Sequence, residues 1–232
     1  MPSFKYRAYD EDRGQGLIRH IMIRNNQQDE LMVVLVVGDI RFPSKKNFVR
    51  VLTTKHPEIK TIVLNVNNRK TSTVLGDREE VIYGPGWIKD SCLGLTFKIS
   101  AQSFYQVNNT QTEIIYSKAL ELADLKGTEL ILDAYCGIGT IGLLASQNAR
   151  KVVGVELNPK AVKDTKYNAR LNDIKNAEFY QGDAGEFLAL SEQQYDVLIM
   201  DPPRSGSDEK FLAAIEYSKP QKIVYISCNP KA

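Results

Sequence analysis

With 232 residues, of which 43% are hydrophobic and 25% charged, the chain can hold one large or two small globular domains. The formal net charge of +2 is too small to indicate nucleic-acid binding by itself. Three widely spaced cysteines are typical of a reducing compartment and exclude a four-thiolate metal or iron–sulfur site from this chain alone. Because no stretch approaches the ~20 apolar residues of a membrane-spanning helix, we predict a cytoplasmic protein without membrane contact.

The first hundred residues are dominated by strand patterns. Apolar runs predict five short strands, at residues 16–24, 30–37, 61–66, 80–83 and 95–99. A polar turn at 25–29 joins the first two strands into a hairpin, and a helix with Ser44 as its N-cap is predicted over 44–55. We therefore predict a small α+β domain over residues 1–100.

From residue 110 onward, helical and strand patterns alternate. The predicted strands are residues 130–134, 151–156, 177–181, 197–200 and 222–227. The helices begin near residues 110, 140, 158 and 207, and the first carries the capping box Thr110-x-x-Glu113 with an apolar face on Ile115, Ala119, Leu122 and Ala123. Since such alternation builds a parallel sheet with helices on both faces, we predict an α/β, Rossmann-like domain over residues 101–232.

A glycine-rich turn follows the first strand of this domain, in DAYCGIGTIG at residues 133–142. Its G-x-G-x-x-G spacing lets the backbone approach a ligand closely, which suits either a dinucleotide or S-adenosylmethionine. Asp133 beside the turn is expected to repel a pyrophosphate and to favour the cationic amino-acid group of S-adenosylmethionine. Glu156, at the end of the next strand, can accept both ribose hydroxyls that these cofactors share.

Two further acids end the following strands. Asp183 can accept a hydrogen bond from an adenine amino group, and Asp201 precedes two prolines that hold its backbone extended toward the crevice. The alternative for each acid is a helix N-cap or a solvated carboxylate. Four acids at four strand ends are hard to assign to capping together.

Cys228 lies in YISCNP at residues 225–230, where the last predicted strand ends. A thiol at that edge of an open α/β sheet is a candidate nucleophile, although by itself a small buried packing residue is the more frequent role. Cys136, inside the glycine turn, is interpreted as a packing residue. His20 and His56 lack the companions of a metal site, so no metal is predicted.

Four segments resemble the RNA uracil-C5 methyltransferase family, which makes 5-methyluridine with S-adenosylmethionine: SFYQVN at 103–108, the glycine turn, DPPR at 201–204 and SCNP at 227–230. The FYQVN form and GLIRHIMIR at 16–24 are most similar to the 23S ribosomal RNA branch. The resemblance implies a class I S-adenosylmethionine-dependent methyltransferase domain acting on ribosomal RNA. It also implies that Cys228 is the nucleophile and that the cofactor contacts are Gln106, Tyr135, Glu156, Asp183 and Asp201.

The chemistry of uracil agrees with that resemblance. Its C5 is a poor nucleophile, and addition of a thiolate to C6 creates an enolate whose C5 attacks the methyl group of the sulfonium. A base then removes the C5 proton and the thiolate is eliminated. A free thiol is only slightly ionised at neutral pH, so Cys228 needs a lowered pKa or a nearby base.

Two departures from the family pattern are expected. The N-terminal β-barrel and four-cysteine iron–sulfur cluster of many relatives are not predicted here, and the resemblance implies two further strands and a general base after SCNP. We therefore expect a C-terminally truncated chain that binds cofactor, turns over poorly or not at all, and self-associates through the exposed edge of its fifth strand.

Other functions remain open from the sequence. The basic and aromatic residues at 41–50 suit phosphate binding or an ordinary solvated helix face in equal measure. The alternatives are a catalytically inactive RNA-binding module, a tRNA uracil-C5 methyltransferase, and an NAD-dependent oxidoreductase that rests on the glycine spacing alone.

Overall fold

The computed structural model describes residues 4, 6–69 and 73–227. The chain divides into two compact units, one formed by Met1–Asp90 and Ile99–Gln102 and the other by Ser91–Lys98 and Ser103–Ala232. A hairpin of β5 (Trp87–Cys92) and β6 (Leu95–Ser100) contributes residues to each unit. The domain boundary predicted after residue 100 stays a prediction.

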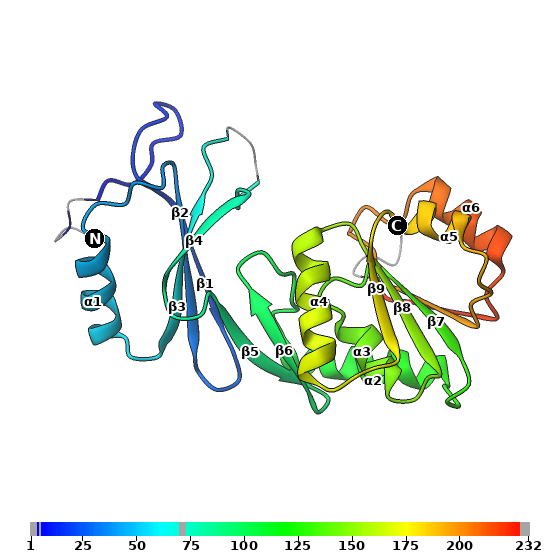
Figure 1. Cartoon of the computed structure of the whole chain (residues 1–232). Helices are drawn as coiled ribbons and strands as arrows, with labels where there is room; N and C mark the ends of the chain where they lie inside the picture. Colours follow the sequence, from blue (N-terminus) through cyan, green and yellow to red (C-terminus); the bar gives the residue numbers. More distant parts are fainter. Residues whose placement is uncertain (1–3, 5, 70–72, 228–232) are drawn as a thin grey trace. The chain divides into compact units, whose positions relative to one another are not determined.

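The first unit is built on a four-stranded sheet in the order β1-β2-β3-β4. Its strands are β1 (Ile18–Asn25), β2 (Leu31–Val37), β3 (Ile59–Val66) and β4 (Arg78–Tyr83). The antiparallel pairing of β1 with β2 confirms the predicted hairpin. Between the parallel strands β2 and β3, helix α1 (Lys45–Lys55) crosses over one face of the sheet, where Phe48 is buried among the core side chains (Figure 1).

In this region one local prediction was confirmed only in part, and one strand was missed. Ser44 occupies the N-cap position of α1, but its backbone is left-handed (φ 53°) and its side chain makes no capping hydrogen bond. An effective N-cap has an extended backbone that aims its oxygen at the free N–H groups of the first turn. Strand β5 was not predicted, because Lys89, Asp90 and Ser91 give it a polar appearance although Asp90 is buried.

The second unit holds a five-stranded parallel sheet in the order β11-β10-β7-β8-β9, which confirms the predicted Rossmann-like α/β fold. The strands are β7 (Leu130–Ala134), β8 (Lys151–Glu156), β9 (Ala177–Gln181), β10 (Val197–Met200) and β11 (Lys222–Tyr225). The chain runs outward from β7 to β9 and then returns to place β10 on the other side of β7. Open α/β sheets bind their ligands at such a switch point, beyond the carboxyl ends of the strands.

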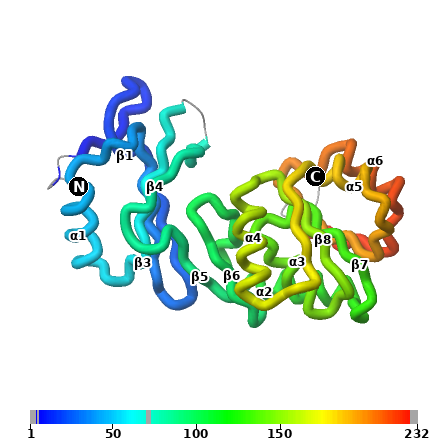
Figure 2. Tube along the Cα trace, in the orientation of Figure 1, coloured from blue at the N-terminus to red at the C-terminus, as the bar shows by residue number. Residues whose placement is uncertain are grey.

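Helices cover both faces of this sheet. In Figures 1 and 2, α3 (Thr140–Ser146) and α4 (Pro159–Leu171) lie on one face, and α5 (Ala184–Leu190) and α6 (Glu209–Ser218) on the other. The core under α5 and α6 is a cluster of apolar side chains that includes Leu132, Val155, Leu188, Leu198 and Phe211. Because both faces are covered, β7 and β10 are buried along their whole length.

Helix α2 (Asn109–Ala123), which precedes β7, begins differently from the prediction. Its N-cap is Asn108, whose side chain accepts a hydrogen bond of 3.1 Å from the backbone N–H of Gln111, so the predicted capping box was wrong. Glu113 instead accepts a bond of 3.1 Å from the backbone N–H of Leu93. Asn108, two residues before the predicted cap, takes the capping role, and Glu113 instead bonds the β5–β6 turn.

The apolar face predicted for α2 was also partly wrong. Ile115 and Leu122 are 47% and 57% exposed. The buried side of the helix carries Thr112, Tyr116, Ala119 and Ala123. Because Thr112 and Tyr116 carry polar atoms, the buried side of α2 does not show up as a purely apolar stripe in the sequence.

Strand β11 lies at the edge of the sheet, and β10 is its one partner among the described residues. Its side chains Ile223 and Tyr225 are 48% and 45% exposed. In the part of the chain that the structure describes, no helix is long and apolar enough to cross a membrane.

Candidate cofactor site

A cavity of about 720 Å³ lies at the carboxyl ends of β7, β8, β9 and β10, a size suited to a small-molecule cofactor. Its walls are the loops after these strands and the segment before α2. The five residues predicted as cofactor contacts all line it: Gln106, Tyr135, Glu156, Asp183 and Asp201. Cys228 lies outside the described residues.

The glycine turn after β7 forms one wall of the cavity. Gly137 and Gly139 have positive φ angles of 56° and 82°, which glycine adopts at no steric cost. A Cβ atom at Gly139 would lie 2.4 Å from the Thr165 side chain, so only glycine fits against α4 at that position. Gly137 thereby brings backbone atoms to the cavity beside the Tyr135 and Ile138 side chains.

Glu156 is held by the backbone on both of its oxygens. Its Oε2 accepts from the N–H of Gly137 at 3.0 Å, and its Oε1 accepts from the N–H of Asn158 at 2.7 Å. Each oxygen of an ionised carboxylate has capacity for a further hydrogen bond. The carboxylate is thus fixed in direction and can accept from two hydroxyl groups of a ligand.

Asp201 and Gln106 both lie near Tyr116 in the same cavity. Burial raises the pKa of Asp201 to about 6. Gln106 hydrogen-bonds to Tyr116, and burial together with the charge of Asp201 raises the pKa of that tyrosine well above its usual value. Tyr116 also lines the cavity, although the sequence did not single it out. The spacing of Thr112, Tyr116, Ala119 and Ala123 was the signal that could have found it.

Asp183 caps helix α5. Its side chain accepts a bond of 3.0 Å from the backbone N–H of Glu186. The capping alternative considered from the sequence is therefore present in the structure. It does not remove Asp183 from the cavity, which its side chain lines together with Gly182 and Ala184.

Asp133 does not lie beside the ligand space, where the sequence had led us to expect it. The residue is only 1% exposed, does not belong to the cavity lining, and faces Gly142, where an added Cβ would lie 2.4 Å from its Oδ2. Burial raises the pKa of Asp133 well above its usual value, with Asp201 and Glu156 adding to the effect. Burial therefore favours the neutral form of Asp133, and the predicted effect of its charge on a ligand stays a prediction.

The thiol of Cys136 is also buried, at 6% exposure. Burial, followed by the nearby Asp133 and Glu156, raises its pKa well above the usual value. A protonated thiol is a poor nucleophile, which agrees with a packing role. Among the described residues, no group of three histidine, cysteine, aspartate or glutamate side chains is placed to hold a metal ion.

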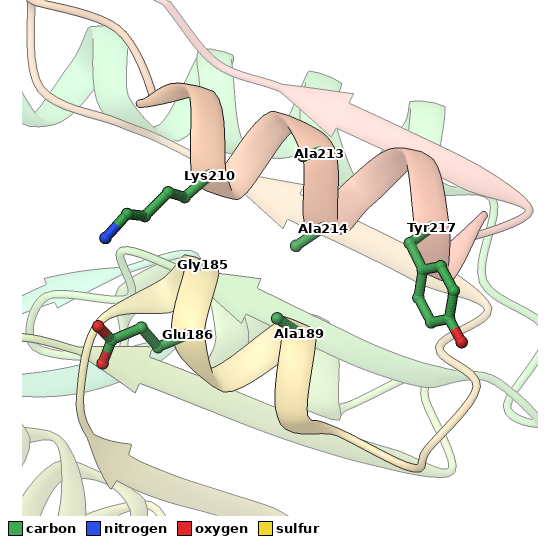
Figure 3. A pocket seen from close by; sticks show the side chains of 7 residues that line it. All are labelled: Gly185, Glu186, Ala189, Lys210, Ala213, Ala214 and Tyr217. Carbon is green, nitrogen blue, oxygen red and sulfur yellow. The ribbon is translucent and has the colours of Figure 1, made fainter.

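A second hollow, of about 530 Å³, lies between α5 and α6. Its floor is made of small residues, and Figure 3 shows Glu186 and Lys210 extending at one end with Tyr217 at the other. None of the residues predicted to bind cofactor lines it. The strand-end cavity is therefore the candidate site.

Comparisons with known proteins identify the family to which this chain belongs. The family model described as tRNA (Uracil-5-)-methyltransferase matches residues 88–232. An uncharacterized RNA methyltransferase of Bacillus cereus is 45% identical over 96% of this chain and 49% of its own length, and one of Clostridium acetobutylicum is 44% identical over 98% and 50%. The chain spans about half the length of these curated relatives.

A solved structure supports the same assignment. The Pyrococcus abyssi tRNA (uracil-54, C5)-methyltransferase, in complex with S-adenosyl-L-homocysteine, superposes with a TM-score of 0.78 at 27% identity. The match covers 96% of this chain and 53% of that one. The fold prediction is thus confirmed as a class I S-adenosylmethionine-dependent methyltransferase domain with a small β-sheet region before it. The chain belongs to the tRNA (uracil-5-)-methyltransferase family.

Proposed function

We propose that this chain carries the cofactor site and the nucleophile of an enzyme that methylates C5 of uridine in 23S ribosomal RNA. The observation that carries the proposal is the convergence of Glu156, Asp183 and Asp201 from three strand ends on one cavity. In a member of this family, such a cavity suits S-adenosylmethionine. The cofactor supplies an electrophilic methyl group when it is bound.

The residues of the cavity fit that cofactor. Glu156, with both oxygens oriented by backbone N–H groups, accepts the two ribose hydroxyls. Asp183 accepts from the adenine amino group, and the Tyr135 ring packs beside it. Gln106 bonds the methionine portion, close to the ionisable Asp201. The positive-φ glycines leave space for the ligand to lie against the backbone of the turn.

Cys228 is the proposed nucleophile. Its thiolate adds to C6 of uracil, and the electron pair moves to C5, which takes the methyl group from the sulfonium as S-adenosylhomocysteine leaves. A base then removes the C5 proton, the double bond re-forms and the thiolate leaves with its electron pair. Among the residues described, the one cysteine that lines the cavity is the buried Cys136 of the glycine turn.

The choice of RNA rests on sequence resemblance. The FYQVN segment and the first strand are most similar to the 23S ribosomal RNA branch. A tRNA uridine is the second candidate, because the solved relative with a TM-score of 0.78 is a tRNA methyltransferase.

Methyl transfer to two RNAs tests the proposal. The chain is incubated with S-adenosylmethionine carrying a radiolabelled methyl group and with unmodified transcripts of 23S ribosomal RNA or tRNA. Because the chain is expected to turn over poorly, we expect slow labelling of 5-methyluridine in the 23S transcript, and no label with Cys228→Ser. Label in the tRNA transcript alone would shift the proposal to the second candidate. Label in neither transcript would contradict it.

A further inference from the structure

Helix α4 buries polar side chains on the face that it turns toward the protein. Asp164 is 4% exposed, and Thr165 and Asn168 are fully buried. A helix normally presents apolar side chains to its core, because a buried polar group is costly unless it is hydrogen-bonded. The partners of these three side chains therefore identify what the helix holds in place.

Two of the three side chains hold the glycine turn. The hydroxyl of Thr165 lies 2.8 Å from the carbonyl oxygen of Gly137 and 2.9 Å from that of Ala161 within α4. The amide of Asn168 donates to the carbonyl oxygen of Ile138 at 3.1 Å. Gly137 and Ile138 both line the cofactor cavity. Two consecutive carbonyl groups of the turn are thus in hydrogen-bond contact with side chains of α4.

The third side chain, that of Asp164, holds the segment that precedes α2. Ser103 donates to Oδ2 of Asp164 at 2.7 Å, and the Lys98 ammonium lies 2.8 Å from Oδ1. Ser103 is itself buried and immediately precedes the cavity-lining segment 104–107, which includes Gln106. Asn168 strengthens this side as well, because its Oδ1 accepts from the backbone N–H of Lys98 at 2.8 Å.

None of the three side chains belongs to the cavity lining. We infer that Asp164, Thr165 and Asn168 are positioning residues that fix the glycine turn and the 104–107 segment at the separation the cofactor requires. The identity of the ligand in this inference rests on the proposed function. Preorganised walls bind a ligand more tightly because less order has to be gained on binding. Cofactor affinity should then depend on side chains that never touch the cofactor.

Calorimetric titration with S-adenosylhomocysteine tests this role. Thr165→Val keeps the shape of the side chain but removes the hydroxyl at Gly137, and Ser103→Ala removes the donor to Asp164. We expect each variant to raise the Kd at least fivefold. Thr165→Ser, which keeps the hydroxyl, should restore the affinity to within twofold of the wild-type chain.

Asn176→Ala is the matched control. Its amide also bonds backbone carbonyl oxygens, those of Ser146 and Ala149 at 2.9 and 3.0 Å, but these residues lie outside the cavity lining. We expect it to lower the Tm about as much as Thr165→Val and to leave the Kd within twofold. The comparison separates a loss of stability from a loss of positioning.

The possible failures are distinguishable. Thr165→Val and Ser103→Ala with unchanged Kd would overturn this inference while leaving the proposed function intact. A second result would also overturn the inference. It is a Thr165→Val variant that has lost its cooperative unfolding transition, together with a Thr165→Ser variant whose affinity is not restored. A wild-type chain that binds no S-adenosylhomocysteine would overturn the proposed cofactor, and the inference with it.

Discussion

At the scale of single residues, the acids at the strand ends have different environments. Glu156 is bonded by two backbone N–H groups, Asp183 caps a helix, Asp133 is buried with a raised pKa, and Asp201 has a pKa of about 6. The sequence predicted that all four lie at the ends of strands. It did not predict that Asp133 faces α3 rather than the cavity, because the direction of a side chain depends on which helix covers its face of the sheet.

Asp201 gives a pH-dependent prediction for stability. Its folded-state pKa of about 6 is above the usual 3.8, so the folded state binds the proton more tightly. Its favourable contribution is complete below pH 3.8 and is lost as the pH rises through 6. At pH 8, Asp201→Asn should therefore raise the free energy of unfolding of the cofactor-free chain by about 1–2 kcal/mol, allowing for partial solvent screening.

Urea denaturation at pH 8 and pH 5 measures this difference. We expect the advantage of Asp201→Asn to shrink at pH 5, where the wild-type side chain is mostly protonated. The same variant should bind S-adenosylhomocysteine more weakly at pH 8, since it lacks the negative charge. A variant with equal or lower stability than the wild-type chain at pH 8 would show that burial of Asp201 carries no cost.

At the scale of elements, strands were easier to predict than helices in this chain. The parallel strands β7 to β10 were predicted with correct bounds. Strands β7, β8 and β10 are mostly buried and largely apolar, whereas β9 buries only Phe179. Helix α5 has only seven residues and was missed. For its N-cap, Asp183, the sequence left a ligand contact and a capping role as alternatives. One acid can serve both purposes where a strand end, a helix start and a cavity coincide.

The edge strand β11 leads to a prediction about self-association. Ile223 is 48% exposed on a strand whose one partner, among the described residues, is β10. Unpaired edges with apolar side chains pair with other chains, and a lysine on the edge opposes this. We expect light scattering to show a mass above that of the monomer at high concentration, and Ile223→Lys to reduce it.

Tyr217→Lys provides the matched control. Tyr217 is 87% exposed on α6, away from the strand edge, so its replacement removes apolar surface without changing the edge. Equal effects of Ile223→Lys and Tyr217→Lys would indicate non-specific hydrophobic association instead of edge pairing. A wild-type chain that stays monomeric would contradict the prediction.

At the scale of the whole molecule, most of the fold could be predicted from the order of strands and helices along the sequence. Alternation of strands and helices from residue 110 onward predicted a parallel sheet, and the strand order places its switch point between β7 and β10. The polar face of α4 could not be predicted, since Asp164, Thr165 and Asn168 acquire partners only when distant segments fold against them. Long-range hydrogen bonds leave no periodic pattern in a sequence.

The central claim is that Cys228 attacks a uracil whose C5 then takes a methyl group. The most direct measurement is covalent trapping with S-adenosylmethionine and RNA that contains 5-fluorouridine, followed by mass spectrometry of the adduct. Because fluorine at C5 cannot leave as a proton does, the thiolate cannot be eliminated after methyl transfer. The account predicts a methylated adduct at Cys228 that Cys228→Ser abolishes and Cys92→Ala retains. No adduct, or an adduct at another residue, would contradict it.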